Sequence, residues 1–147
     1  MLKIFKTKEV KTPERTGKNS GFDFFIPNIK EPHVVEPYGN ITISLGIKVR
    51  IPKNYVLIAF NKSGIATKLG LIVGACVIDE NYTGEIYLNL INTTEREVEL
   101  RSNMKAIQFI LIKQVYHDIC ICLSEETMYK NFNKKERGSS GFGSTGI

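Results

Sequence analysis

The chain has 147 residues, of which 42% are hydrophobic and 24% are charged, and its formal net charge is +5. This length and balance fit one globular domain and exclude a chain that is disordered throughout. The positive charge permits a polyanionic partner, such as a nucleoside triphosphate or a nucleic acid, without choosing between them.

Two short apolar runs predict strands near the start of the chain, over residues 2–6 and 20–27. The polar stretch between them predicts a loop. The second run is interrupted by one carboxylate, Asp23. An Asp in such a run usually bonds to nearby backbone groups, and a functional role is the alternative interpretation.

Residues 41–51 give the clearest structural signal. Every odd position is apolar, and the even positions are polar or glycine. A period of two predicts a strand with one buried face, bent near Gly46. Residues 52–54 predict a turn, and residues 55–60 predict a largely buried return strand.

A short helix is predicted over residues 61–70, with its end at Gly70. Ser63 lies near its start. Either the Ser63 side chain caps the helix, or the free backbone N–H groups of the first turn hold an anion.

Residues 74–92 predict a β-hairpin with a polar tip. An apolar run leads to Asp79, Asn81 and Gly84 turn the chain, and alternating residues lead back. This pattern alone also describes an ordinary surface hairpin, whose polar residues serve only the turn.

Residues 93–103 are charged and turn-like, with alternation over 97–100, and apolar runs predict further strands over 104–112 and 119–123. Gln108 is either a satisfied core amide or a polar group that faces a site, and Cys120 and Cys122 share one face of the last strand. Many short strands with little helix predict an all-β barrel or sandwich.

The C-terminal part predicts a tether over residues 124–136 and a Gly-rich tail over 137–147, after a β-barrel domain over 1–123. Arg137 is followed within ten positions by four glycines and several hydroxyl groups. Glycines let backbone N–H groups approach phosphate oxygens, and arginine binds phosphate through two parallel hydrogen bonds. The same composition also occurs in unstructured termini.

The tail and residues 74–92 together resemble the fifth and third sequence motifs of the homotrimeric deoxyuridine triphosphatases (dUTPases). The resemblance runs from Gly21 to Gly146, nearly the whole chain, with the motifs in the expected order. It implies the dUTPase fold, a β-barrel of jelly-roll type. It also implies hydrolysis of dUTP to dUMP and pyrophosphate, which supplies dUMP for thymidylate synthesis and limits uracil in DNA.

The resemblance assigns roles within residues 74–92. Asp79 would be the general base that activates the water attacking the α-phosphorus. Tyr82 would pack under the deoxyribose and leave no room for a 2′-hydroxyl. Backbone groups around Cys76, Val77 and Tyr87 would pair with the uracil edge.

Other motifs would hold the triphosphate. The resemblance implies phosphate contacts from Lys62, Ser63, Gly64 and Gln108, and a hydrated Mg²⁺ steered by Asp23 through water. Phe142 would stack on uracil while the rest of the tail closes on the β- and γ-phosphates, through Arg137, Gly143, Ser144 and Thr145. One site would draw on all three subunits of a homotrimer.

Four departures from the family pattern bear on phosphate binding and base recognition. Lys62 stands where arginine is usual, so a bidentate contact becomes a point charge. Thr83 also replaces a frequent arginine, Cys76 replaces a frequent glycine, and residues 103–105 replace Gly-Asp-Arg. None of these removes the base, the stacking Phe or the tail, so an active enzyme is expected.

Three alternatives remain: a dCTP deaminase-like enzyme, a nucleotide-binding regulatory protein, and a general nucleic-acid binder. Members of the dCTP deaminase family lack this tail. A general nucleic-acid binder is disfavoured because the sequence has no basic stripe interleaved with aromatic residues. No nucleic-acid partner is therefore expected.

The expected location is the cytoplasm, or the host cell cytoplasm if a virus encodes the chain. No apolar run approaches the roughly 18 residues of a membrane span, and no apolar signal core follows the Lys-rich start. The three cysteines show no zinc-ligand spacing, which suits a reducing compartment.

Overall fold

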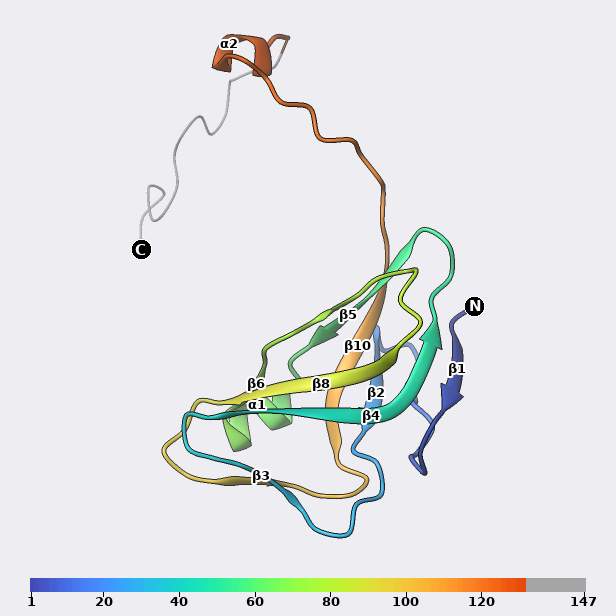
Figure 1. The fold of residues 1–147 in the computed structure, drawn as a ribbon, viewed down its shortest axis with the longest axis vertical. Coiled ribbons are helices and arrows are strands. Elements are labelled where there is room, and N and C mark those ends of the chain that lie inside the picture. The colour runs from blue at the N-terminus through green and yellow to red at the C-terminus, as the bar shows by residue number, and fades with distance from the viewer. Residues whose placement is uncertain (132–147) are drawn as a thin grey trace. The chain divides into compact units, whose positions relative to one another are not determined.

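The computed structural model describes residues 1–131 of the chain. The chain divides into two compact units, Met1–Tyr116 and a second unit that begins at His117. Apart from one short helix, every helix or strand of the first unit is a strand (Figure 1), as the all-β prediction requires.

The strands of the first unit form two four-stranded sheets and one two-stranded sheet, all with antiparallel pairs. The first sheet has the order β1 (Lys3–Lys6), β4 (Asn40–Arg50), β8 (Glu85–Asn92) and β6 (Leu71–Val73). The second has the order β2 (Gly21–Phe25), β10 (Lys105–Lys113), β5 (Tyr55–Phe60) and β7 (Val77–Ile78). β3 (His33–Val35) pairs with β9 (Val98–Leu100). One hydrophobic core contains buried residues of both larger sheets, so the unit is a β-sandwich.

The predicted long strand is confirmed as β4, including its bend. Ile43, Leu45, Ile47 and Val49 are buried, while Gly46 adopts a left-handed φ of 65°. Between the pairs Ser44↔Tyr87 and Lys48↔Glu85, four residue steps on β4 oppose two on β8. Two extra residues keep the same face buried, which explains why the alternation persists through this bulge.

The prediction of a hairpin over residues 74–92 is wrong in its pairing. The turn forms, with a bond of 3.1 Å from the backbone N–H of Tyr82 to the carbonyl of Asp79. However, β7 pairs with β5, whereas β8 pairs with β4 and β6, so the two arms lie in different sheets. The chain crosses between the sheets at Gly74, where a Cβ would lie 1.9 Å from Oδ1 of Asn89.

The predicted helix is confirmed as α1 (Ser63–Leu69), which ends at Gly70 in the left-handed conformation. Its N-cap residue is Lys62, and no side chain caps it. The interpretation of Ser63 as the cap is therefore wrong, and the start of the helix remains open.

Within the described part of the second unit, residues 117–131, the structure contains one short helix, α2 (Glu125–Met128), capped by Ser124. The strand predicted over residues 119–123 is not formed. Its apolar side chains, Ile119, Ile121 and Leu123, are 94%, 86% and 98% exposed. An apolar segment forms a stable strand only beside another strand, and none of the described strands pairs with it.

Neither helix in the described residues is long and apolar enough to cross a membrane.

Candidate active site

Strand pairing brings three predicted motifs together at one end of the second sheet. Gln108 of β10 lies opposite Asp23 of β2 on one side and Phe60 of β5 on the other. Lys62 lies two residues after the end of β5 and is the N-cap of α1. Residues that are distant in sequence therefore meet because antiparallel strands fix which residues face each other.

A charged cluster of Glu14, Asp23, Lys62 and Lys105 occupies this end. Lys62 Nζ lies 2.8 Å from Oδ1 of Asp23, and Lys105 Nζ lies 3.4 Å from Oδ2 of Asp23 and 2.5 Å from Glu14. The hydrogen bond to Glu14, supported by Asp23, raises the pKa of Lys105. The Asp23 side chain is only 17% exposed and has both oxygens paired, so it bonds to lysines instead of nearby backbone groups.

Gln108 is held beside the charged cluster. Its amide nitrogen donates to the backbone carbonyl of Asn61 over 2.9 Å. A Cβ at Gly21 would lie 2.8 Å from the Gln108 side-chain oxygen, so the glycine leaves space for this amide. Gln108 is half-buried, at the edge of the core and next to the start of α1.

The start of α1 is accessible. Ser63 and Gly64 are exposed, and a Cβ at Gly64 would meet no atom within 4 Å. Within the described chain, the backbone N–H groups of these two residues make no hydrogen bond. Two donors and the Lys62 ammonium group therefore lie together at an open surface.

The turn after β7 leaves one carboxylate free and anchors the next. Asp79 is exposed, and its side chain makes no hydrogen bond or ion pair with any described residue. Glu80 accepts bonds from the backbone N–H of Asn54 (2.7 Å) and from the Tyr116 hydroxyl (2.9 Å). The second bond raises the pKa of Tyr116. Glu80 thus fixes the turn while Asp79 stays available.

Tyr82 folds back over the turn. Its hydroxyl donates to the backbone carbonyl of Glu85 over 2.8 Å. A Cβ at Gly84 would lie 2.4 Å from the Tyr82 hydroxyl oxygen, so the ring lies directly against the glycine. Tyr82 is nevertheless 41% exposed and can present its ring to a ligand.

The separation of β7 and β8 leaves backbone groups free. At Val77, β7 pairs only with β5, and at Tyr87, β8 pairs only with β4, among the described strands. Both side chains are more than half exposed, and Cys76 is exposed beside them. Each strand thus has an unpaired edge that can bind a planar hydrogen-bonding group.

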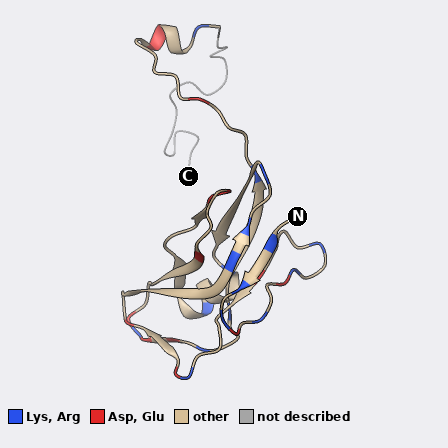
Figure 2. Ribbon diagram, turned by 45° about the vertical axis from the view of Figure 1, so that its right-hand side comes forward, with Lys and Arg blue, Asp and Glu red and all other residues tan. Residues whose placement is uncertain are grey.

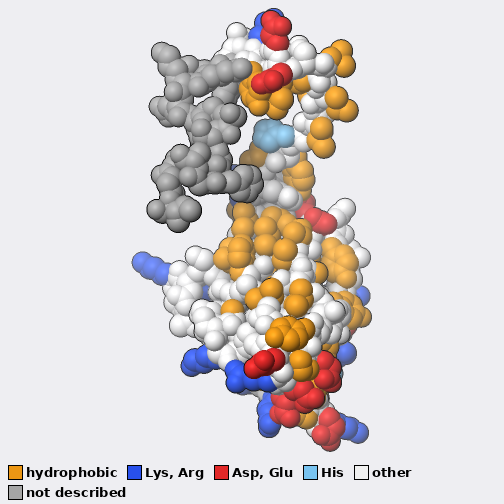
Figure 3. All heavy atoms as spheres, turned by 90° about the vertical axis from the view of Figure 1, so that its left-hand side faces the viewer, with side chains coloured by type: hydrophobic (Ala, Val, Ile, Leu, Met, Phe, Trp, Pro, Cys, Tyr) orange, Lys and Arg blue, Asp and Glu red, His pale blue; other side chains and the backbone are white. Residues whose placement is uncertain are grey.

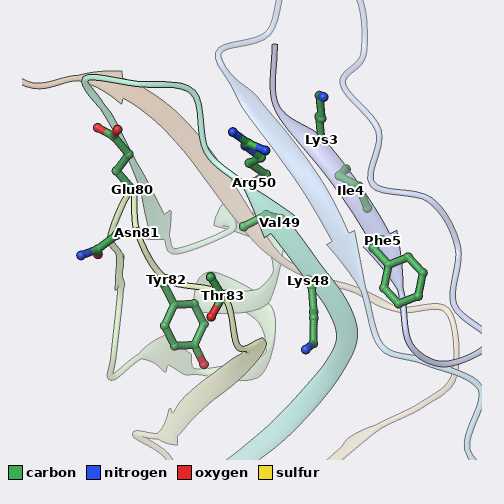
Figure 4. Close-up of a pocket in the computed structure, with 10 residues that line it drawn as sticks. All are labelled: Lys3, Ile4, Phe5, Lys48, Val49, Arg50, Glu80, Asn81, Tyr82 and Thr83. Atoms are coloured by element: carbon green, nitrogen blue, oxygen red, sulfur yellow. The ribbon is translucent and has the colours of Figure 1, made fainter.

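A pocket of about 400 Å³ lies between the turn after β7 and the strands β1 and β4. Figure 4 shows residues of the turn on one side and residues of β1 and β4 on the other. Lys3 and Arg50 lie opposite each other in the β1–β4 pair, and Lys48 lies on the same strand as Arg50. Figure 2 shows Lys and Arg residues on neighbouring strands of the first unit. Of the predicted site residues that the structure describes, Tyr82 alone lines this pocket.

The predicted residues thus form two groups in one chain: the charged cluster with the start of α1, and the turn with β7 and β8. No hydrogen bond or ion pair between described residues joins them. The predicted tail residues lie outside the described residues: Arg137, Phe142, Gly143, Ser144 and Thr145.

Sequence reasoning missed Glu14 and the bridging role of Lys105. Glu14 reaches the cluster through an isolated backbone bridge to Asp23. No sequence pattern marks such a bridge, because it depends on how a long loop returns to the sheet.

No group of three or more His, Cys, Asp or Glu side chains that could bind a metal occurs among residues 1–131. Mg²⁺ typically keeps several waters and binds through one or two carboxylates together with substrate phosphates. A single carboxylate such as Asp23, acting through water, is compatible with that mode of binding.

The dUTPase family model matches residues 8–146. The deoxyuridine 5′-triphosphate nucleotidohydrolase of Paramecium bursaria Chlorella virus 1 is 34% identical, over 99% of this chain and 98% of that protein. The Candida albicans enzyme of the same name is 29% identical, over 99% of this chain and 87% of its own length.

Solved structures show the same fold. The dUTPase of Staphylococcus bacteriophage 80alpha, bound to dUpNHpp, has a TM-score of 0.84 at 22% identity, over 100% of this chain and 99% of that one. A mutant dUTPase from phage phi11 of S. aureus, described as coordinating a structural Mg(II) ion, has a TM-score of 0.76 at 20% identity. The match covers 86% of this chain and 99% of the phage chain.

Proposed function

This chain belongs to the dUTPase family and is a dUTP nucleotidohydrolase, and we propose that Asp79 is its general base. One observation carries the assignment: the Asp79 carboxylate is exposed and unpaired in the described chain, while the adjacent Glu80 anchors the turn. A general base must be ionised and free to accept a proton. A carboxylate that already accepts hydrogen bonds from the protein is less available for this role.

In the proposed reaction, Asp79 accepts a proton from a water molecule whose oxygen attacks the α-phosphorus of dUTP. The bond from the α-phosphorus to the bridging oxygen breaks, and pyrophosphate leaves with the electron pair. The products are dUMP and pyrophosphate.

The free edges of β7 and β8 are proposed to recognise the base. Backbone groups around Cys76, Val77 and Tyr87 pair with the uracil edge, and Tyr82 packs under the deoxyribose. The contact between Tyr82 and Gly84 supports this role, because it holds the ring in one place.

The charged cluster and the start of α1 are proposed to bind the triphosphate, through Lys62, Ser63, Gly64 and Gln108. In the described structure Lys62 pairs with Asp23, so phosphate oxygens compete with Asp23 for this ammonium group. Members of the family use Mg²⁺, and a bound Mg²⁺ supplies positive charge to the phosphates. Asp23 would steer it through water.

A homotrimer is proposed to unite the two groups. Apolar side chains are exposed on the face in Figure 3, and Ile119, Ile121 and Leu123 are almost fully exposed in the second unit. Such apolar surface typically marks an interface. Another subunit would give residues 119–123 the strand partner that no described strand of this chain supplies, and a third subunit would contribute the tail.

Pyrophosphate release tests the proposed function. The protein is incubated with dUTP, UTP, dTTP and dCTP, each with and without Mg²⁺. Selective, Mg²⁺-dependent turnover of dUTP is expected. Release of ammonia from dCTP would indicate a deaminase instead, and a folded trimer that turns over none of the four would indicate a nucleotide-binding regulator.

Truncation before Arg137 tests the tail. Light scattering should still show a trimer, since the tail is proposed to cap the nucleotide, while turnover of dUTP should collapse. Full activity without the tail would remove Arg137 and Phe142 from the site.

A further inference from the structure

The β4–β8 pair is irregular where β8 begins. The bulge in β4 inserts two extra residues between Ser44 and Lys48, opposite the first steps of β8 from Glu85. Glu85 pairs with Lys48 just beyond this bulge, where the ladder is irregular, so side-chain contacts can add to backbone pairing in holding the start of β8.

The Glu85 side chain makes those contacts. Its two carboxylate oxygens accept hydrogen bonds from the hydroxyls of Thr7 and Ser44, on two different segments of the chain. Both segments are tied to the bulge: the backbone N–H of Thr7 donates to the Gly46 carbonyl over 2.8 Å, and the Gly46 N–H donates to Ser44 Oγ over 3.1 Å.

The charge on Glu85 strengthens this anchor. Hydrogen bonds from Ser44 and then Thr7 lower the pKa of Glu85, and the nearby ammonium groups of Lys8 and Lys48 act in the same direction. The carboxylate is thus held ionised, and hydrogen bonds to an ionised acceptor are about twice as strong as those between neutral groups.

The anchored residue also holds Tyr82. The backbone carbonyl of Glu85 accepts the hydrogen bond of the Tyr82 hydroxyl, and the preceding residue, Gly84, supports the ring. A continuous set of contacts therefore runs from Thr7 and Ser44 through Glu85 to the Tyr82 ring.

We propose that Glu85 is a positioning residue that fixes the Tyr82 ring through Thr7 and Ser44, and thereby sets the selection of dUTP over UTP. The proposal rests on the proposed role of Tyr82 beneath the deoxyribose. Glu85 need not touch the nucleotide, because it acts on where Tyr82 lies. When the anchor is lost, the ring moves and leaves space for a 2′-hydroxyl.

The test compares kcat/KM for dUTP and for UTP in the wild-type trimer and in Glu85→Ala. The ratio is expected to fall by about tenfold or more in Glu85→Ala, since a displacement of about 1 Å in a positioned group can cost about 10²-fold. UTP should gain in kcat/KM, while kcat for dUTP should stay within about threefold, because Asp79 is retained.

Glu97→Ala is the matched control. Glu97 is exposed, and its side chain makes no hydrogen bond or ion pair within the described chain. In Glu97→Ala, the ratio of kcat/KM for dUTP to kcat/KM for UTP should equal that of the wild type. Glu85→Gln, which keeps the shape and part of the hydrogen bonding, should restore most of the selectivity that Glu85→Ala loses.

Thr7→Val combined with Ser44→Ala removes the two donors and leaves Glu85 in place. It should also lower the ratio, and it replaces Glu85→Ala if that variant does not fold. An unchanged ratio in a folded variant without the anchor would overturn the proposal.

A second readout does not depend on activity. NMR of labelled tyrosine, with the Tyr82 signal assigned by Tyr82→Phe, should show a changed environment or faster ring motion in Glu85→Ala. If wild-type enzyme did not discriminate against UTP, the proposed role of Tyr82 would fail, while an altered Tyr82 signal would still support the anchor. An identical Tyr82 signal would contradict it.

Discussion

Asp23 and Asp79 are the two aspartates of the proposed active site, and their surroundings differ. Asp23 lies within a strand, is 17% exposed, and pairs with Lys62 and Lys105. Asp79 lies in a turn, is exposed, and pairs with no described residue. The comparison separates two uses of a carboxylate: one organises positive charge, and the other is left free to accept a proton.

The contacts that position the two aspartates also differ. Strand pairing on both sides of β10 builds the charged cluster before any ligand binds. The Asp79 turn instead depends on side-chain anchors, Glu80 to Asn54 and Tyr116, and Glu85 to Thr7 and Ser44. Substitutions near Asp79 should therefore act on chemistry and selectivity, and those near Asp23 on stability and phosphate binding.

The largest effect is expected for Asp79→Asn. Loss of a general base typically costs about 10²–10⁴-fold in rate, so kcat for dUTP should fall by that factor. Binding of a non-hydrolysable dUTP analogue, measured by calorimetry, should change little. Wild-type turnover in this variant would mean that another group activates the water.

The free energy of unfolding should fall more on substitution of Asp23 than on substitution of Asp79, the reverse of the order expected for the rate. Asp23→Ala removes charge-assisted hydrogen bonds from a mostly buried carboxylate and should lower the free energy of unfolding by about 1–3 kcal/mol. Asp79→Ala, at an exposed and unpaired position, should change it by less than about 0.5 kcal/mol. Urea unfolding at one fixed protein concentration measures both, and equal effects would remove the distinction between the two aspartates.

Lys62→Arg should have a smaller effect, on nucleotide affinity. A guanidinium group binds phosphate through two parallel hydrogen bonds, so KM for dUTP should fall by about threefold. Lys68→Arg, at an exposed position on the same helix, is the control and should leave KM unchanged. A higher KM in Lys62→Arg would show that the site is shaped for lysine.

The smallest effect concerns pH. Because the folded state lowers the pKa of Glu85, its ionised form stabilises the fold at pH values above the ordinary glutamate pKa of about 4.3. That contribution is lost as the pH falls through the lower, folded value. Wild type should therefore exceed Glu85→Gln in unfolding stability at neutral pH, and the difference should shrink in acid. A difference that does not change with pH would mean that the charge of Glu85 is unimportant.

Apolar patterns predicted strands well where another described strand lies beside them. Residues 41–51 alternate and residues 119–123 form an apolar run, but β4 has β1 and β8 beside it, and the later segment has no described partner. The placement of β7 and β8 in different sheets was also not predictable, because residues that favour a turn do not determine which strand each flanking segment will pair with.

Site residues were chosen by resemblance, and the structure explains part of that choice. The resemblance selected Asp23, Lys62 and Gln108, and the strand register places them together. Glu14 lies outside every motif, and Glu85 lies within residues 74–92 but received no role there, so their roles arise only from contacts with distant residues. Such contacts depend on the bulge and on loop paths, which local patterns do not encode.

The most direct test of the central assignment is hydrolysis of dUTP in water enriched in the heavy oxygen isotope, with mass spectrometry of both products. If Asp79 activates water for attack at the α-phosphorus, the label enters dUMP and is absent from pyrophosphate, and Asp79→Asn forms the same labelled product far more slowly. Label in pyrophosphate would place the attack at the β-phosphorus and contradict the account.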